Sequence, residues 1–242
     1  MRPRHFLLCL TALGGCAAGG AAAEPEPTTV PTVALAELAA IEPLTTAPPP
    51  TTVPPPPASV AIIGDSLTVA AEEQITFALE ALGVGAIVVD AEEGRRINHA
   101  TDGVTSGATA ADQLAAAAGD PDVWVVALGT NDIPGFGPDG YRADIEALLA
   151  ELPSGAPVIW VDAWIERRID ETRAANAVLR EVAAEHPDVT VVDWFQFGDD
   201  PGLIIDDGIH LADAGQERFA EQVAAAVLAV SAGTSSSPAG AG

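Results

Sequence analysis

Short apolar runs alternate with longer amphipathic segments between residues 59 and 230. The runs are rich in Val, Ile and Ala and stay apolar at successive positions, as is typical of strands that are buried on both faces. The predicted strands cover residues 59–63, 86–90, 123–128, 158–161 and 189–192. The segments that follow them have the apolar spacing of helices, which are predicted over residues 68–82, 109–118, 140–152, 171–185 and 212–230.

A strand followed by a helix, five times in succession, predicts parallel pairing, because each helix returns the chain to the same end of the sheet. The expected fold is therefore a three-layer α/β/α sandwich around a five-stranded parallel sheet, with right-handed crossovers. Pro121, Pro157 and Pro187 stand just before three of the strands, where each ends the preceding helix. Residues that directly follow the strands are expected to meet at one edge of this sheet.

The flanking segments differ from this pattern. Residues 1–23 carry two Arg before an apolar run too short to span a bilayer, which predicts an export signal. Leu13-Gly14-Gly15-Cys16 resembles a bacterial lipobox, which implies lipidation of Cys16; the alternative is cleavage after Ala23. Residues 24–57 hold 11 of the 20 Pro and predict an extended linker. The folded domain is expected over residues 58–231, and residues 232–242 are expected to form a flexible tail.

The net charge of the chain limits the classes of molecule that it is expected to bind. The formal net charge is −25, and all ten basic residues are Arg. This balance excludes a nucleic-acid binder and adhesion to anionic lipid, so membrane contact is expected only through the N-terminal anchor. The absence of Lys excludes a P-loop lysine and a Schiff-base lysine. Both Cys lie within residues 1–23, so the domain is expected to have no disulfide and no Cys-based metal site. No cofactor and no bound metal are expected.

Polar residues follow the strands at positions suited to acyl transfer. Ser66 follows the first strand, Gly94 the second and Asn131 the third, while Asp207 and His210 precede the last helix. A serine hydroxyl needs a base to attack a carbonyl, and a carboxylate that orients the base completes a triad. The sequence therefore predicts Ser66 as nucleophile, His210 as base and Asp207 as its partner. The expected oxyanion donors are the backbone N–H groups of Ser66 and Gly94 and the amide of Asn131.

Other interpretations of several residues stay open. Ser66 is also suited to be the N-cap of the first helix. Gly103 and Gly107 are alternatives to Gly94 as the oxyanion glycine. Arg95 and Arg96 are suited either to bind a polar substrate or to pair with the abundant acids.

Two further features have alternative interpretations. Trp164 is suited to stack on a sugar ring or to pack in the core. The acid pairs at residues 199–200 and 206–207 are either solvated loop acids or ligands of a calcium ion.

These motifs resemble the SGNH (GDSL-type) hydrolases. Gly64-Asp65-Ser66-Leu67 and the segment from Asp207 to His210 match the first and last family motifs, and Gly94 and Asn131 stand between them in the family's order. The resemblance covers residues 59–230 and implies a flavodoxin-like sandwich and a serine esterase. The stretch from Asp90 to Arg95 is also similar to the subgroup found as extracytoplasmic domains of cell-surface O-acyltransferases, as are residues 176–180 and 191–194.

Together with the predicted export signal, the resemblance implies an exported serine esterase that hydrolyses small acyl esters such as acetyl esters. It also implies carbohydrates or other cell-envelope molecules as substrates. The protein is expected to be a monomer. The membrane acyltransferase that often precedes such domains is not found in the sequence, which favours hydrolysis over transfer. The alternatives are an O-acyltransferase that works with a membrane partner and a non-catalytic surface binding protein.

Overall fold

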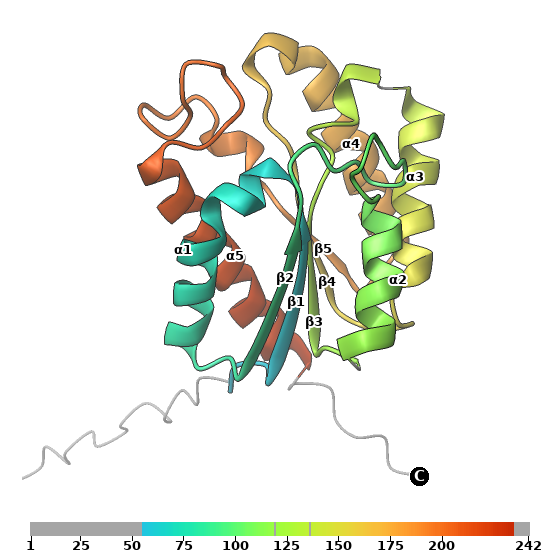
Figure 1. Cartoon of the computed structure of the whole chain (residues 1–242), viewed down its shortest axis with the longest axis vertical. Coiled ribbons are helices and arrows are strands. Elements are labelled where there is room, and N and C mark those ends of the chain that lie inside the picture. Colours follow the sequence, from blue (N-terminus) through green and yellow to red (C-terminus); the bar gives the residue numbers. More distant parts are fainter. Residues whose placement is uncertain (1–54, 119, 136, 235–242) are drawn as a thin grey trace, which may run out of the picture. The chain divides into compact units, whose positions relative to one another are not determined.

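A computed structural model describes residues 55–118, 120–135 and 137–234 (Figure 1). The predicted export signal, Cys16 and nearly all of the linker lie outside these residues. The centre of the domain is a five-stranded sheet in the order β2-β1-β3-β4-β5, with every neighbouring pair parallel. Its strands are β1 (Ser59–Gly64), β2 (Ala86–Ala91), β3 (Val123–Ala127), β4 (Val158–Val161) and β5 (Val189–Val192).

In the described part of the chain, five α-helices cover the two faces of the sheet, so the predicted α/β/α sandwich is confirmed (Figure 1). Helices α1 (Ser66–Leu82) and α5 (Asp213–Thr234) lie together on one face. Helices α2 (Gly107–Ala118), α3 (Pro138–Glu151) and α4 (Ile169–Glu185) lie on the other. Among the described residues, no helix is both long and apolar enough to cross a membrane.

Alternation along the central strands builds a hydrophobic core on each side of the sheet. Val60 and Ile62 of β1 pack toward α1 and α5, whereas Ala61 and Ile63 of the same strand pack toward α2, α3 and α4. Successive side chains of a strand point to opposite faces, so a strand covered on both faces must be apolar throughout. The three central strands β1, β3 and β4 meet this condition.

The expectation of burial on both faces is wrong for the two edge strands. Ala86 and Val88 of β2 and Thr190 of β5 are exposed. An edge strand has a neighbour on one side only, and the helices pack over the middle of the sheet.

The helices also begin and end differently from the prediction at several places. Helix α3 begins at Pro138, two residues earlier than predicted, because proline fits the first turn, where no intrahelical N–H bond is needed. Helix α5 continues to Thr234, so the first three residues of the predicted tail are helical.

Candidate active site

The residues selected from the sequence meet at the carboxyl ends of β1, β2 and β3. They line a pocket of about 400 Å³ whose walls come from the start of α1, the loop after β2, the loop after β3 and the loop before α5. The lining residues are Ser66, Val69, Ala70, Glu93, Gly94, Asn131 and His210. Segments that are distant in the sequence thus share one small cavity because the strands are parallel.

Ser66, His210 and Asp207 form a continuous chain of contacts. The Ser66 Oγ lies 3.1 Å from Nε2 of His210. The other ring nitrogen of His210, Nδ1, lies 2.7 Å from Oδ2 of Asp207. With the Nδ1 proton donated to this carboxylate, Nε2 is left free to accept the proton of the Ser66 hydroxyl. The geometry is that of a nucleophile, a base and a group that orients the base.

The loop before α5 holds Asp207 in place. Its Oδ1 accepts hydrogen bonds from the backbone N–H groups of Ile209 and His210, at 2.8 and 2.9 Å. Desolvation by itself would raise the pKa of this carboxyl, but the hydrogen bonds from His210 and Ile209 outweigh it and lower the pKa below its ordinary value. Asp207 is therefore an anion that faces the imidazole at neutral pH.

Ser66 is the first residue of α1 and lines the pocket. The N-cap of this helix is Asp65, whose carboxylate accepts a hydrogen bond from the N–H of Leu67, so the interpretation of Ser66 as the N-cap is wrong. Within the described part of the chain, the N–H of Ser66 has no hydrogen-bond partner. A free N–H at a helix N-terminus is suited to bind an anion.

Gly94 is the only one of the three candidate glycines that lines the pocket. Its φ of 78° lies in the left-handed region, and within the described part of the chain its N–H has no partner. The N–H of Gly107 donates to the carbonyl of Arg96 at 2.8 Å and is therefore occupied. The geometry therefore favours Gly94 over Gly103 and Gly107 as an oxyanion donor.

Asn131 places its side-chain amide beside Ser66. Its Nδ2 donates to the carbonyl oxygen of Arg95 at 3.0 Å and lies 3.4 Å from Oδ2 of Asp65. The second contact is long for a hydrogen bond, so the amide can redirect that hydrogen toward an anion in the pocket. The Asn131 amide is thus held by the Arg95 carbonyl and can still donate a hydrogen bond to an oxyanion.

Two buried carboxyls behind the pocket were not singled out from the sequence. Burial raises the pKa of Asp65 to about 7 and the pKa of Asp132 to about 6. Asp132 accepts the N–H of Ile97 and also lies 3.4 Å from Nε of Arg96. The sequence signal for Asp65 was its position just before a helix, where aspartate is a favoured cap.

Other candidates lie away from the pocket. Trp164 is buried and packs edge-on against Phe195, which contradicts the interpretation that it stacks on a sugar. Arg95 is buried among acids rather than open to substrate. Among the described residues, no group of three or more His, Cys, Asp or Glu side chains is arranged to hold a metal ion.

The sequence matches a family model over residues 62–218, that of the GDSL-like Lipase/Acylhydrolase family. The chain belongs to this family. The resemblance to the SGNH (GDSL-type) hydrolases is thereby confirmed, and hydrolase chemistry is supported in general terms. No curated protein matches the sequence.

Solved structures share the fold. One is the C-terminal catalytic domain of peptidoglycan O-acetyltransferase A from Streptococcus pneumoniae, with 23% identity, a TM-score of 0.56 and coverage of 72% of this chain and 95% of that one. A carbohydrate acetylesterase family member from Sinorhizobium meliloti has 17% identity and a TM-score of 0.56, covering 72% and 99%. A lipolytic protein of the G-D-S-L family from Veillonella parvula has 18% identity and a TM-score of 0.56, covering 68% and 94%.

Proposed function

We propose that the protein is an exported serine esterase that removes small acyl groups, such as acetyl, from carbohydrate or other cell-envelope esters. The observation that carries the proposal is the chain of contacts from Ser66 through His210 to Asp207, at a pocket where the N–H groups of Ser66 and Gly94 have no partner among the described residues. A nucleophile, a base and oxyanion donors are the groups that ester hydrolysis requires.

In the proposed first step, the Ser66 Oγ attacks the ester carbonyl carbon while its proton passes to Nε2 of His210. The carbonyl oxygen becomes an oxyanion, which accepts hydrogen bonds from the N–H groups of Ser66 and Gly94 and from the amide of Asn131. The C–O bond to the alcohol then breaks, and the alcohol leaves with the proton from His210. This step leaves the acyl group on Ser66.

In the second step, water attacks the acyl group while His210 takes a proton from the water. The carboxylic acid is released, and the hydroxyl of Ser66 recovers its proton. Acyl transfer, the alternative chemistry, differs only in that a sugar hydroxyl replaces this water. The Asp207 carboxylate stabilises the imidazolium in both steps.

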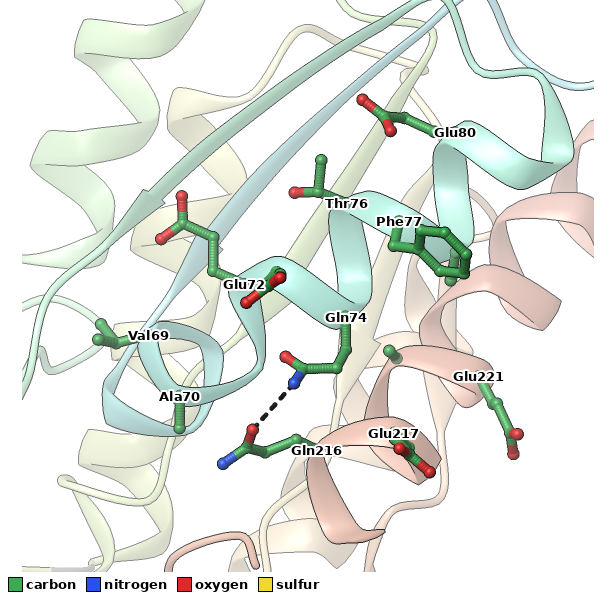
Figure 2. Close-up of a pocket in the computed structure, with 13 residues that line it drawn as sticks. Val69, Ala70, Glu72, Gln74, Thr76, Phe77, Glu80, Gln216, Glu217 and Glu221 are labelled. Atoms are coloured by element: carbon green, nitrogen blue, oxygen red, sulfur yellow. Dashed lines mark hydrogen bonds between the residues drawn. The ribbon is translucent and has the colours of Figure 1, made fainter. Parts of the chain in front are cut away.

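A groove next to the catalytic pocket supports a carbohydrate as the alcohol part of the substrate. The groove lies between α1 and α5, has a volume of about 1040 Å³ and shares Val69 and Ala70 with the catalytic pocket (Figure 2). The side chain of Phe77 is 73% exposed in the groove and offers a flat apolar face. Gln74 of α1 donates to Gln216 of α5 at 3.1 Å across the groove (Figure 2). An aromatic face beside amides and carboxylates suits a sugar ring and its hydroxyls.

The charge of this groove supports a neutral or cationic carbohydrate rather than an anionic one. Five glutamates line it: Glu72, Glu73, Glu80, Glu217 and Glu221. Only Glu221 has an ion-pair partner among the described residues, Arg218 at 3.3 Å. Within the same part of the chain the other four carboxylates have no ion-pair partner, and their charges repel an anionic polymer at low ionic strength.

The sequence of the N-terminal segment supports a proposal about where in the cell the protein acts. We propose that residues 1–23 direct export and that Cys16 carries a lipid anchor. Incorporation of labelled palmitate into the full chain, and its loss in Cys16→Ala, is the expected result. Unlabelled protein that begins after Ala23 contradicts lipidation and supports simple secretion.

The test of the catalytic proposal is the release of p-nitrophenol from p-nitrophenyl acetate by the protein purified after export. Ser66→Ala is expected to abolish activity while the circular dichroism spectrum and the melting temperature stay near those of the wild type. Equal activity of the two proteins, or a folded wild type that is inert toward all acetyl esters supplied, contradicts the proposal. Addition of an oligosaccharide acceptor distinguishes hydrolysis from transfer, since transfer moves the acetyl group to the sugar.

A further inference from the structure

Arg95 is the one arginine that is buried in the described part of the chain, with an exposed fraction of 1%. It follows Gly94 directly and lies at the carboxyl end of the sheet, yet it does not line the catalytic pocket. Burying a guanidinium costs free energy unless its N–H groups are hydrogen-bonded. The acceptors of these N–H groups therefore identify the segments that Arg95 links.

The guanidinium joins three segments around the pocket. Its Nη2 donates to Oδ1 of Asp90 at the end of β2, to Oε2 of Glu92 in the next loop and to Oγ1 of Thr105 before α2, at 2.7, 2.9 and 3.2 Å. Its Nε donates to the carbonyl oxygen of Thr105 at 3.3 Å. Glu92 in turn accepts from the hydroxyl and the N–H of Thr105, at 2.8 and 3.0 Å.

The same residue also touches the segments of the other two oxyanion donors. Its Nη1 lies 3.4 Å from the carbonyl oxygen of Gly64, two residues before Ser66. Its backbone carbonyl accepts the Nδ2 hydrogen of Asn131 at 3.0 Å. Arg95 is therefore covalently bonded to Gly94, hydrogen-bonded to Asn131 and in contact with Gly64, which precedes Ser66 by two residues.

We propose that Arg95 is a positioning residue of the oxyanion hole: its buried fork fixes the N–H of Gly94 relative to Ser66 and Asn131. This inference rests on the proposed function. Gly94 needs such support because its left-handed turn is closed only by the hydrogen bond from the Arg95 N–H to the carbonyl of Glu92, at 3.2 Å. Among the described residues, no side chain is hydrogen-bonded to the backbone of Gly94. A planar guanidinium can hold several oxygens at fixed angles, which a lysine ammonium cannot do.

The test is a kinetic comparison of the wild type with Arg95→Lys and Thr105→Val. Arg95→Lys keeps the charge but loses the fork, and Thr105→Val removes one acceptor of the fork with little change of shape. For p-nitrophenyl acetate, Arg95→Lys is expected to lower kcat by ~10- to 100-fold with KM within about twofold, because a misplaced oxyanion donor loses part of its contribution. Thr105→Val is expected to lower kcat by a smaller factor in the same direction.

A trifluoromethyl ketone separates positioning from a loss of folded protein. Ser66 adds to this ketone reversibly and places an oxyanion at the donors, so its Ki reports the oxyanion hole. The Ki does not depend on the fraction of protein that is folded. In both variants, Ki is expected to rise by about the factor by which kcat falls.

Arg142→Lys is the matched control, since Arg142 lies on α3 and pairs with Glu146, Glu181 and Glu185 at the surface. It is expected to leave kcat and Ki unchanged. Wild-type kcat and Ki per folded protein in both test variants overturn the positioning role. If Arg95→Lys does not fold, Thr105→Val decides alone. Full activity of Ser66→Ala overturns the proposed function itself, which is a different result from either of these.

Discussion

The hydroxyl oxygen of Ser66 lies 3.1 Å from Nε2 of His210, although 144 residues separate the two in the sequence. One belongs to the first turn of α1 and the other to the loop before α5, and these two helices pack against each other on the same face of the sheet. The contact therefore depends on the packing of α1 on α5 as well as on the loops. Changes in either helix are expected to reach the catalytic pair.

Asp207→Asn is expected to lower kcat by roughly 10³- to 10⁴-fold, because an amide no longer selects the imidazole tautomer or stabilises the imidazolium. Steady-state kinetics with p-nitrophenyl acetate measures the effect. Asp206→Asn is the matched control, since Asp206 is the exposed neighbour in the same loop and is expected to be silent. Equal losses in the two variants would indicate a general disturbance of the loop rather than a triad.

Gly94→Ala is expected to lower kcat, because the added methyl group disfavours the φ of 78° and displaces the N–H. Gly103→Ala is a close control: its φ is 84°, and a Cβ meets nothing within 4 Å at either position. Both variants are expected to lose about 1–2 kcal/mol of stability from the left-handed strain. Chemical denaturation measures that loss, and only Gly94→Ala should also lose activity. A similar loss of kcat in Gly103→Ala would reopen the choice of the oxyanion glycine.

Phe77→Ala tests the groove between α1 and α5. If a sugar ring stacks on Phe77, the substitution removes about 0.5–1.5 kcal/mol of binding, or roughly 2- to 12-fold in KM for an acetylated oligosaccharide. Activity toward p-nitrophenyl acetate is expected to stay unchanged, since Phe77 lines the groove but not the catalytic pocket. Val88→Ala, at an exposed apolar position of β2 outside the groove, serves as control. An unchanged KM for oligosaccharides of all lengths would remove the groove from the substrate path.

The stability of the fold is expected to fall as the pH rises from about 4 to about 7. Burial raises the pKa of Asp65 to about 7 and the pKa values of Asp132 and Asp162 to about 6, from 3.8. In this pH range the folded state binds more protons than the unfolded state, so raising the pH favours unfolding. One pKa unit corresponds to about 1.4 kcal/mol, so the three raised pKa values together correspond to a change on the order of 10 kcal/mol.

Thermal unfolding between pH 4.5 and pH 8 measures this dependence. The lowered pKa values of Glu92 and Asp207 act in the opposite sense, but their stabilisation is lost only below about pH 4.5, outside the range. Asp162→Asn removes one titrating group away from the pocket and is expected to flatten the curve, whereas exposed Asp170→Asn is not. A melting temperature that rises with pH over this range would contradict the raised pKa values.

The sequence predicted the strands, the helices and part of the candidate active site. Apolar spacing depends on residues three or four positions apart, or two in a strand, so the strands and the helices followed from local pattern. The first turns of α1, α2, α3 and α4 did not, because each of these helices begins two residues earlier than predicted. The positions of Ser66, Asn131 and His210 relative to those elements then predicted that they would meet at one sheet edge. The spacing from Asp207 to His210 is a local property and needed no tertiary contact.

Other features depended on packing between distant segments, which no local pattern records. Residue type alone does not distinguish the three candidate glycines Gly94, Gly103 and Gly107. The path of the loops places Gly94 at the pocket and brings the N–H of Gly107 to the carbonyl of Arg96. From the sequence, Arg95 and Arg96 are equally suited to bind a substrate. In the structure, Arg95 is surrounded by the ends of β1 and β2 and by the segment before α2.

The sequence by itself thus determined the alternation of strands and helices and the kinds of side chain at the strand ends. The tertiary structure alone decided the strand order, the exposure of the edge strands and the burial of Arg95 and Trp164. The physical reason is that a residue's own periodicity shows which side it faces, whereas its burial and its hydrogen bonds are set by residues far away in the chain.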